Sequence, residues 1–311
     1  MKFFLDRWKG DSSRLKIVPP VPQPDRRGVA VVVILRNEAH YLQDWLTFQA
    51  LSGVDEVLLY DDGSTDDTVE IAKRFNRIPV TVTPWHMDVT VAGSDLKIAK
   101  QELAYAHAIS TQGARFRWLA VIDSDEIIVP VEGETIGEAL RPLEGHTNVS
   151  MQWVMFGHSG HDERPADPFP LAFNMRAGRH AGHLVNFKCI VDPCDVSLVR
   201  THKFETRTYG TETVNDQGVV ASDYKQRLRP EFLSNARLQL NHYFLRSRAD
   251  FRRKLESSVL PIASMKKIIG HREDLARDIE AEPVEDFVTH EFLRRVGCGD
   301  AAAYRAFGAG A

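Results

Sequence analysis

Apolar residues in the first half of the chain gather in three short runs, and each run stops at polar or charged residues. The runs are Val29–Leu35, Val57–Tyr60 and Leu119–Ile122. Continuous apolar runs of this kind, the first rich in β-branched residues, are typical of strands buried on both faces of a parallel sheet. Parallel strands end at one edge, where open α/β folds bind ligands. We therefore expect the residues that follow the runs to surround one crevice.

Helical spacing appears between and after these runs. Residues 41–49 and 69–75 carry apolar side chains three or four positions apart, and residues 95–110 are predicted to form a further helix. Strands that alternate with helices predict an α/β fold. Farther along, residues 283–296 predict a last packed helix that begins at a proline. The glycine- and alanine-rich residues 297–311 are expected to be disordered.

The third run ends in the acids Asp123, Asp125 and Glu126. Carboxylates held close together repel each other unless a cation or a hydroxyl-rich ligand lies between them. Mg²⁺ and Mn²⁺ favour oxygen ligands of this kind and bridge them to phosphates. A solvated acidic turn is the alternative for these three residues taken alone. The strand before them and the other polar strand ends favour a ligand site.

The second run ends in Asp61 and Asp62, and Gly63 then permits a tight turn. Residues 64–66 can cap the helix that follows. A strand, a turn and a capped helix without a ligand would explain residues 63–66, but they would not explain two acids at the strand end. Acids in this position commonly accept hydrogen bonds from ribose hydroxyls or a base N–H in nucleotide-binding folds.

The sequence changes character after Pro130. Strand-like runs recur at residues 149–156, 186–191 and 238–245, and loops that contain several histidines separate them. His242 lies in the last run, where the alternating pattern leaves two interpretations open, a ligand or a hydrogen-bonded core histidine. Arg246 follows it and is either a phosphate-binding residue or the start of a basic surface helix.

The order of these motifs resembles the glycosyltransferase family 2-like proteins, in the branch whose first strand ends in Arg-Asn-Glu and which carries a DxD motif. The matching segments are Val-Val-Ile-Leu-Arg-Asn-Glu at 32–38, Tyr-Leu-x-x-Trp-Leu at 41–46, the acidic strand end at 53–68 and Ile-Asp-Ser-Asp-Glu at 122–126. The likeness covers about residues 28–130. It continues more weakly at 153–157, 160–161 and 241–247.

The resemblance implies a GT-A-like mixed β-sheet flanked by helices, with helical C-terminal elements. Residues 28–130 would form the nucleotide-sugar (donor) half, and residues 131–311 the acceptor half and C-terminal helices of one continuous domain. An extended arm at residues 1–27 would precede them. The implied activity moves a sugar from a nucleotide-diphosphate donor, most simply a UDP-sugar, to a hydroxyl of a glycan or a lipid-linked acceptor. We expect inversion and a requirement for Mn²⁺ or Mg²⁺.

The resemblance also suggests site residues. The metal would be held by Asp123, Asp125 and His242, and the catalytic base would be Asp162 or Glu163. The candidates for contact with the nucleotide-sugar, some of which have a solvated surface position as their plain alternative, are Arg36, Glu38, Asp61, Asp62, Lys97, Asp123, Lys188 and Arg246.

Composition and net charge limit the possible classes of protein. The net charge of −4 gives no reason to expect nucleic acid, and the three cysteines do not form a disulfide framework. No apolar run reaches the roughly eighteen residues of a membrane span. We expect a cytoplasmic enzyme of polysaccharide biosynthesis that contacts membranes only peripherally. The alternatives are a nucleotidyltransferase, which should show a glycine-rich basic loop after its first strand, and a non-catalytic nucleotide-sugar binding protein.

Overall fold

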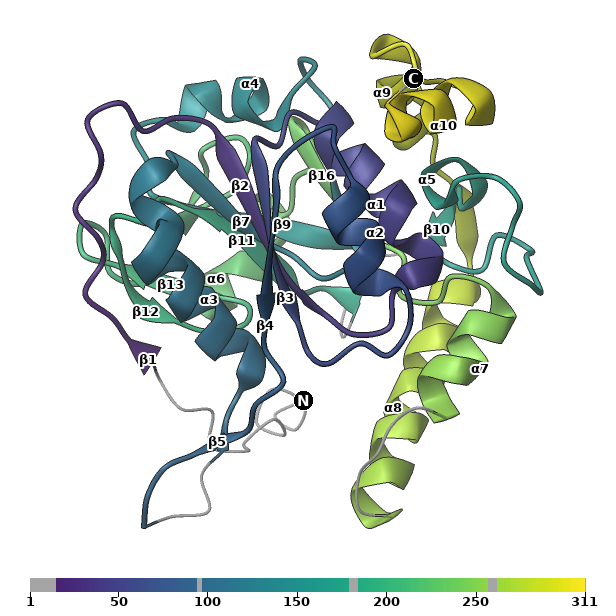
Figure 1. Cartoon of the computed structure of the whole chain (residues 1–311), viewed down its shortest axis with the longest axis horizontal. Helices are drawn as coiled ribbons and strands as arrows, with labels where there is room; N and C mark the ends of the chain where they lie inside the picture. The colour runs from purple at the N-terminus through teal and green to yellow at the C-terminus, as the bar shows by residue number, and fades with distance from the viewer. Residues whose placement is uncertain (1–14, 94–96, 179–183, 257–261, 311) are drawn as a thin grey trace.

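A mixed sheet of ten strands forms the centre of the computed structural model, which describes residues 15–93, 97–178, 184–256 and 262–310 (Figure 1). Its parallel part consists of the three predicted strands and one more. These are β7 (Trp118–Val121), β2 (Val29–Leu35), β3 (Glu56–Asp61) and β4 (Val80–Pro84), in that spatial order. β2 lies between β7 and β3, and six of its seven residues are buried, as the apolar run predicts.

The second part of the sheet is largely antiparallel. β11 (Phe187–Val191) pairs with β7 on one side and with β9 (Asn148–Met155) on the other. β14 (Thr213–Val214) and β15 (Val220–Ala221) complete that edge. The remaining pair is β8 (Glu126–Pro130), which the sequence did not reveal, and β16 (Leu238–His242), which lies between β8 and β9.

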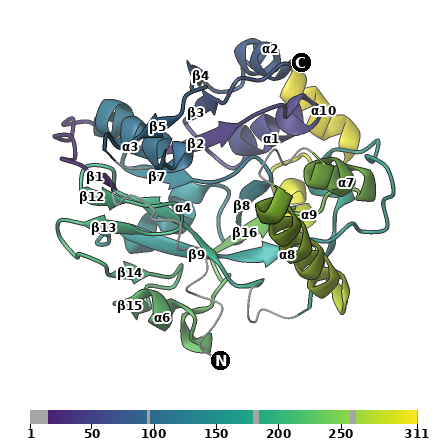
Figure 2. The same cartoon turned by 90° about the horizontal axis from the view of Figure 1, so that it is seen from below.

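Helices cover both faces of the parallel part, so that the sheet lies between two apolar layers (Figures 1 and 2). Alternate β2 residues such as Val31 and Val33 pack toward α1 (Ala39–Leu51) and α2 (Thr68–Arg74). Val32 faces the other way, toward α3 (Lys100–Gln112). The period of two along the strand thus supplies both cores, and the predicted α/β fold with a mixed sheet flanked by helices is confirmed.

The rest of the chain forms helices and small sheets. The helices are α4 (Ile136–Leu140), α5 (Phe169–Ala172), α6 (Tyr224–Arg227), α7 (Arg248–Glu256), α8 (Ile262–Glu280), α9 (Val288–Arg295) and α10 (Ala301–Ala309). The strands are β1 (Leu15–Lys16), β12 (Val196–Val199), β13 (Phe204–Thr206), β5 (Val89–Thr90), β6 (Lys97–Ile98), β10 (Met175–Ala177) and β17 (Pro283–Glu285). The expected helical C-terminal elements are therefore present. No helix of the described ranges is both long and apolar enough to cross a membrane.

Two sequence predictions of helix position were wrong in part. Residues 97–98 pair with β5, so the helix expected from residue 95 begins only at Lys100, and residues 95–96 lie outside the described ranges. Residues 283–285 likewise pair with β10, which delays the last predicted helix to Val288. In both places strand pairing overrides a helical pattern.

The expected disorder after residue 297 was also wrong, because residues 301–309 form α10. The Asp300 side chain caps this helix by accepting a hydrogen bond from the Ala303 N–H (2.9 Å). Tyr304 is buried and donates its hydroxyl to the Asp44 carbonyl on α1 (2.6 Å). Residues 1–14 of the predicted arm and residue 311 lie outside the described ranges.

Candidate functional site

The turn between β7 and β8, residues 123–126, is called the acid loop below. It closes on itself through two hydrogen bonds. The Asp123 N–H donates to Glu126 Oε2 (2.8 Å), and the Glu126 N–H donates to the Asp123 carbonyl (3.1 Å). These bonds turn the chain from the parallel strand β7 into β8, and they place Asp123 and Asp125 at the carboxyl end of β7.

Asp123 contacts residues from two other elements. Lys188 Nζ of β11 lies 2.8 Å from Asp123 Oδ1, and the Gln101 amide of α3 donates to the same oxygen (2.6 Å). The Lys188 side chain is 0% exposed. Burial alone would lower the pKa of Lys188, but the nearby carboxylates raise it above its ordinary value, so the lysine remains charged. Desolvation opposes ionisation of Asp123, and Lys188 outweighs it and lowers the pKa of Asp123.

Glu126 is the fully buried acid of the loop, and its Oε2 lies 3.9 Å from Lys188 Nζ. Burial raises the pKa of Glu126 well above its ordinary value, because Lys188 opposes the desolvation only in part. We conclude that Lys188 and Asp123 carry the charges of this buried cluster at neutral pH, and that Glu126 shapes the loop as a neutral group.

Asp125 has a different set of neighbours. Lys254 Nζ of α7 lies 2.8 Å from its Oδ2, and His242 Nε2 of β16 lies 3.4 Å from its Oδ1. Burial would raise the pKa of Asp125, but Lys254 and His242 lower it well below the ordinary value. Asp125 is therefore ionised, and both of its oxygens face nitrogen atoms from the second half of the chain.

His242 combines the two interpretations that its sequence pattern left open. Its side chain is 6% exposed and packs against Trp153 of β9, with ring centroids 4.5 Å apart. Its Nε2 nevertheless points at Asp125, and its Nδ1 lies 4.0 Å from Glu126 Oε1. His242 is thus a core residue with one nitrogen directed at the acid loop.

Arg246 joins the first strand end to the acid loop. Its guanidinium donates to Glu38 Oε2 (2.7 Å) and to the Ser124 carbonyl (3.0 Å), and it lies over the Tyr41 ring, 4.3 Å from the centroid. The Arg246 backbone has a φ of 52°, which is unusual for a residue other than glycine. Strained backbone of this kind persists where the surrounding contacts determine it, and it often accompanies functional sites.

The second acidic strand end is held mainly by its own turn. Both carboxylate oxygens of Asp61 accept the Ser64 N–H (3.1 and 3.3 Å). Asp62 is more exposed and pairs with Lys100 Nζ at the start of α3 (2.8 Å). Asn37, at the end of β2, donates its N–H to Ser64 Oγ (2.9 Å). Asp62 consequently has more freedom than Asp61 to contact a ligand.

The other predicted residues lie farther from these contacts. Arg36 and Glu163 are exposed, and Lys97 is exposed on β6. Asp162 is 81% exposed and pairs with Arg248 (2.8 Å). Within the described part of the chain, no hydrogen bond or ion pair joins Asp162 or Glu163 to the acid loop. Lys188 was expected at the nucleotide, but a side chain without exposed surface can act only through Asp123.

Sequence reasoning missed Lys254 and Gln101 as neighbours of the acids. Lys254 lay in a basic helix and Gln101 on a polar helix face, and neither pattern indicates a distant partner. Arg36, Asp162 and Glu163 were predicted from their positions near a motif, and all three side chains are exposed.

The residues suit a divalent cation shared with a diphosphate better than a closed metal cage. No group of three or more His, Cys, Asp or Glu side chains able to hold a metal occurs among the described residues, so the predicted set of Asp123, Asp125 and His242 does not gather around one point. Asp125 and His242 do present an oxygen and a nitrogen 3.4 Å apart. Neighbouring ligands of an octahedral ion are separated by roughly 3 Å, and Mg²⁺ commonly uses one or two protein ligands with substrate phosphates.

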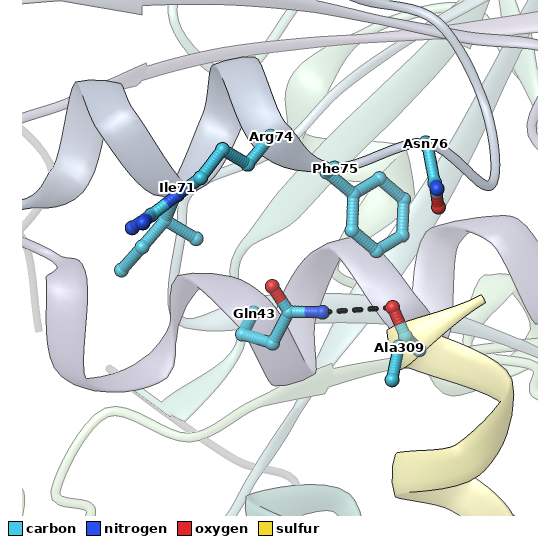
Figure 3. A pocket seen from close by; sticks show the side chains of 7 residues that line it. Gln43, Ile71, Arg74, Phe75, Asn76 and Ala309 are labelled. Atoms are coloured by element: carbon cyan, nitrogen blue, oxygen red, sulfur yellow. Dashed lines mark hydrogen bonds between the residues drawn. The ribbon is translucent and has the colours of Figure 1, made fainter. Parts of the chain in front are cut away.

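Two cavities lie elsewhere. One of about 210 Å³ lies where α10 meets α1 and α2, and one of about 330 Å³ lies between α10 and α1. Figure 3 shows the smaller one, in which the Gln43 amide donates to the Gly308 carbonyl (3.0 Å) beside Phe75 and Asn76. Neither cavity is lined by a residue of the acid loop or of the Asp61–Asp62 strand end. They therefore do not mark the candidate site.

The family model of glycosyltransferase family 92 matches residues 29–251, a segment that includes both acidic strand ends and His242. The chain belongs to glycosyltransferase family 92. The predicted enzyme class, a glycosyltransferase of EC 2.4, agrees with this family. The matching family is 92, whereas the sequence motifs had suggested the family 2-like group.

Plant members of family 92 share part of this sequence. A Ricinus communis protein is 26% identical over 226 residues, which are 67% of this chain and 38% of that protein. An Oryza sativa subsp. japonica protein is 24% identical over 202 residues, 60% of this chain and 32% of that protein. The chain thus spans about a third of the length of these curated relatives.

Two solved structures that match this chain are less similar to it in sequence than the two plant proteins. Glucosyl-3-phosphoglycerate synthase from Mycobacterium tuberculosis, in complex with Mn²⁺, uridine diphosphate and glucosyl-3-phosphoglycerate, is 22% identical. The match covers 41% of this chain and 44% of that one, with a TM-score of 0.27. A mycobacterial protein is 16% identical over 88% of this chain and 76% of its own, with a TM-score of 0.34.

Proposed function

We propose that the protein transfers a sugar from a nucleoside diphosphate donor, with uridine diphosphate as the first nucleotide to test. The acceptor would be a hydroxyl group of a glycan or of a lipid-linked glycan. A divalent cation, Mn²⁺ or Mg²⁺, would support the reaction, with inversion at the anomeric carbon. The observation that carries the proposal is the convergence of Asp125 and His242 at the strand edge that also holds Asp61 and Asp62.

The donor would lie across the ends of β3, β2 and β7. Asp62 is the more exposed acid of the β3 end and would accept a hydrogen bond from the base or ribose, while Asp61 keeps the turn in shape. Asp123 is one-third exposed and held in one orientation by Lys188 and Gln101, which suits a contact with a ribose hydroxyl. Each of these acids is already oriented before a ligand arrives, which reduces the entropic cost of binding.

Asp125 and His242 would hold the cation, whose chemistry is to neutralise the diphosphate as it leaves. Arg246 is fixed by Glu38 and the Ser124 carbonyl, and its charge adds to the positive potential around the leaving group. Asp162 and Glu163 remain the predicted candidates for the base that takes the proton of the acceptor hydroxyl. Their loop lies next to α7, since the Ala249 N–H donates to the Asp162 carbonyl (2.9 Å).

Membership of a glycosyltransferase family favours this proposal over a nucleotidyltransferase or a non-catalytic binding protein. A cytoplasmic location, peripheral contact with a membrane and a role in polysaccharide biosynthesis belong to the same proposal. A lipid-linked acceptor would require that contact, whereas a soluble glycan acceptor would not.

A panel of nucleoside diphosphates tests the proposal directly. Thermal unfolding is measured with uridine, guanosine, cytidine, adenosine and thymidine diphosphates, each with Mn²⁺ and with EDTA. Binding to the folded state raises the apparent melting temperature, so one nucleotide should stabilise the protein only when Mn²⁺ is present. The matching nucleotide-sugar should then be hydrolysed slowly in the presence of Mn²⁺. Absence of stabilisation by every nucleotide would contradict the proposal.

A further inference from the structure

Lys254 pairs with one carboxylate oxygen of Asp125 and also contacts Phe244. Its Nζ lies 2.8 Å from Asp125 Oδ2 and donates to the Phe244 carbonyl (3.2 Å). The ammonium also lies 4.1 Å from the centroid of the Phe244 ring, a favourable cation–π distance. With His242 near the other oxygen, Asp125 has a nitrogen atom facing each of its two oxygens.

The surroundings of Lys254 allow its side chain to move while its backbone stays fixed. The side chain is 34% exposed, whereas that of Lys188, which holds the neighbouring Asp123, is 0% exposed. The Lys254 carbonyl accepts a hydrogen bond from Arg272 of α8 (2.8 Å), which anchors this end of α7. A lysine ammonium on a flexible four-carbon stem can exchange one partner for another at little cost, and a buried one cannot.

Two cations cannot both stay close to the Asp125 carboxylate without repulsion, since like charges a few ångströms apart still repel near a protein surface. If Asp125 takes part in holding a divalent cation, Lys254 must give up its place there. The nearest new partner of opposite charge would then be the diphosphate of the donor.

We propose that Lys254 is an exchangeable counter-ion of the site. It neutralises Asp125 while the site holds no divalent cation, and it transfers to an oxygen of the donor diphosphate when the cation and the donor are bound. This inference rests on the proposed function and adds a residue that binds the leaving group. Lys188 is the fixed counter-ion of the same loop and does not exchange.

Lys254→Met tests the exchange, because methionine keeps an apolar stem against Phe244 and removes only the charge. Mn²⁺ binding without nucleotide is measured by the electron paramagnetic resonance signal of free Mn²⁺. The substitution should raise Mn²⁺ affinity by up to about fivefold, since a competing, partly exposed ion pair is lost. Binding of uridine diphosphate in the presence of Mn²⁺, measured by calorimetry, should weaken by about tenfold or more, because a charge-assisted hydrogen bond is lost.

Arg252→Met is the matched control, since Arg252 lies on the same helix and is exposed. It should change neither affinity. Lys254→Arg keeps the charge and should retain most of the nucleotide affinity. Melting temperatures without ligands show whether each variant is folded.

The outcomes separate this inference from the proposed function. Unchanged affinities in Lys254→Met, with Mn²⁺-dependent nucleotide binding in the parent, would overturn the exchange and leave the proposed function standing. Weaker nucleotide binding without tighter Mn²⁺ binding would make Lys254 a permanent diphosphate contact, which also overturns the exchange. Equal nucleotide binding by the parent in Mn²⁺ and EDTA would mean that Lys254 replaces the cation, which overturns the exchange and the cation requirement together.

Discussion

The two acidic strand ends of this family 92 protein are built in different ways. At the end of β3, Asp61 accepts the Ser64 N–H of its own turn and Asp62 pairs with Lys100, so these partners come from the same half of the chain. At the end of β7, the acids contact Lys188 of β11, His242 of β16 and Lys254 of α7. The first end is held by residues of the first half of the chain, among them Asn37 and Lys100. The second depends on elements from the other half of the chain.

This difference separates two kinds of acidic site within one sheet edge. The end of β3 can present Asp62 to solvent without a large electrostatic cost, because water and the partly exposed Lys100 both stabilise its charge. The acid loop instead holds ionised carboxylates beside a buried ammonium, so its charges balance only when the distant residues are in place. We expect substitutions at the two ends to differ more in their effect on stability than on chemistry.

The largest difference in stability should appear when the carboxylates beside the lysine are replaced by amides at each end. Asp123→Asn combined with Glu126→Gln leaves Lys188 buried without a carboxylate, and breaking a buried pair in this way costs about 3–5 kcal/mol of unfolding free energy. Asp62→Asn leaves Lys100 partly exposed and should cost less than about 1 kcal/mol. Urea unfolding of both variants measures the two losses, and equal losses would contradict the comparison.

Asp125→Asn should remove the cation-dependent part of nucleotide binding while the fold survives. The amide keeps the shape of the carboxylate, but it lacks the charge that holds a divalent ion. We expect affinity for uridine diphosphate with Mn²⁺ to fall on the order of a hundredfold, in line with the several kcal/mol that a bound metal supplies. Calorimetric titration measures the change, and Asp162→Asn in the exposed loop is the control that should leave affinity unchanged.

Asp62→Ala and Asp61→Ala should separate recognition from turn stability. Loss of the partly exposed acceptor at Asp62 should weaken binding of uridine and of uridine diphosphate alike by about tenfold, within the 1–3 kcal/mol of a lost charged hydrogen bond. Asp61→Ala removes the acceptor for the Ser64 N–H, so it should chiefly lower the unfolding free energy, by about 1 kcal/mol. Fluorescence or calorimetric titration of both variants tests the assignment, and the reverse pattern would exchange the two roles.

The smallest expected effect is a pH dependence of the unfolding free energy that comes from His202. Burial, aided by the charge of Lys188, lowers the pKa of His202 to about 3. The unfolded chain therefore binds a proton below about pH 6.5 that the folded protein does not accept, so stability is lost as pH falls. Between pH 7 and pH 6 the loss should stay under about 1 kcal/mol. Denaturation curves of His202→Gln should lack this component, and an identical pH dependence in both proteins would contradict it.

The sequence predicted the acids and the strands that carry them because each motif is continuous. Residues 29–35, 57–60 and 119–122 are buried strands, and the residues that follow them meet at one edge. The partners of the acids could not be predicted, since Lys188 and Lys254 occupy ordinary strand and helix patterns. Strand periodicity does not state which side chains of β11 lie under the other elements of the fold, so the fully buried Lys188 looked like a residue that touches the nucleotide.

The composition of residues 297–311 led to a wrong prediction of disorder, although local signals for a helix were present. Residues 297–311 are rich in glycine and alanine, which suggested disorder, but Asp300 is a helix cap and Tyr304 is an apolar anchor four residues later. Alanine is also the residue with the highest helix propensity. The start of α3 was misplaced for another reason. Residues 97–98 pair across a hairpin, and this pairing is a tertiary contact that no helical pattern contains.

The position of β16 between β8 and β9 bears on how the protein reaches its native state. β8 follows the acid loop directly, yet its one strand partner in the described chain is β16, which comes far later in sequence. Contacts between distant segments form slowly, because the entropy of a long connecting loop is lost before the contacts form. The backbone groups of Ile127–Val129 therefore lack their hydrogen bonds to β16 until that later strand has formed. Any nascent chain or fragment that stops before residue 238 carries the acids without the geometry that makes them a site.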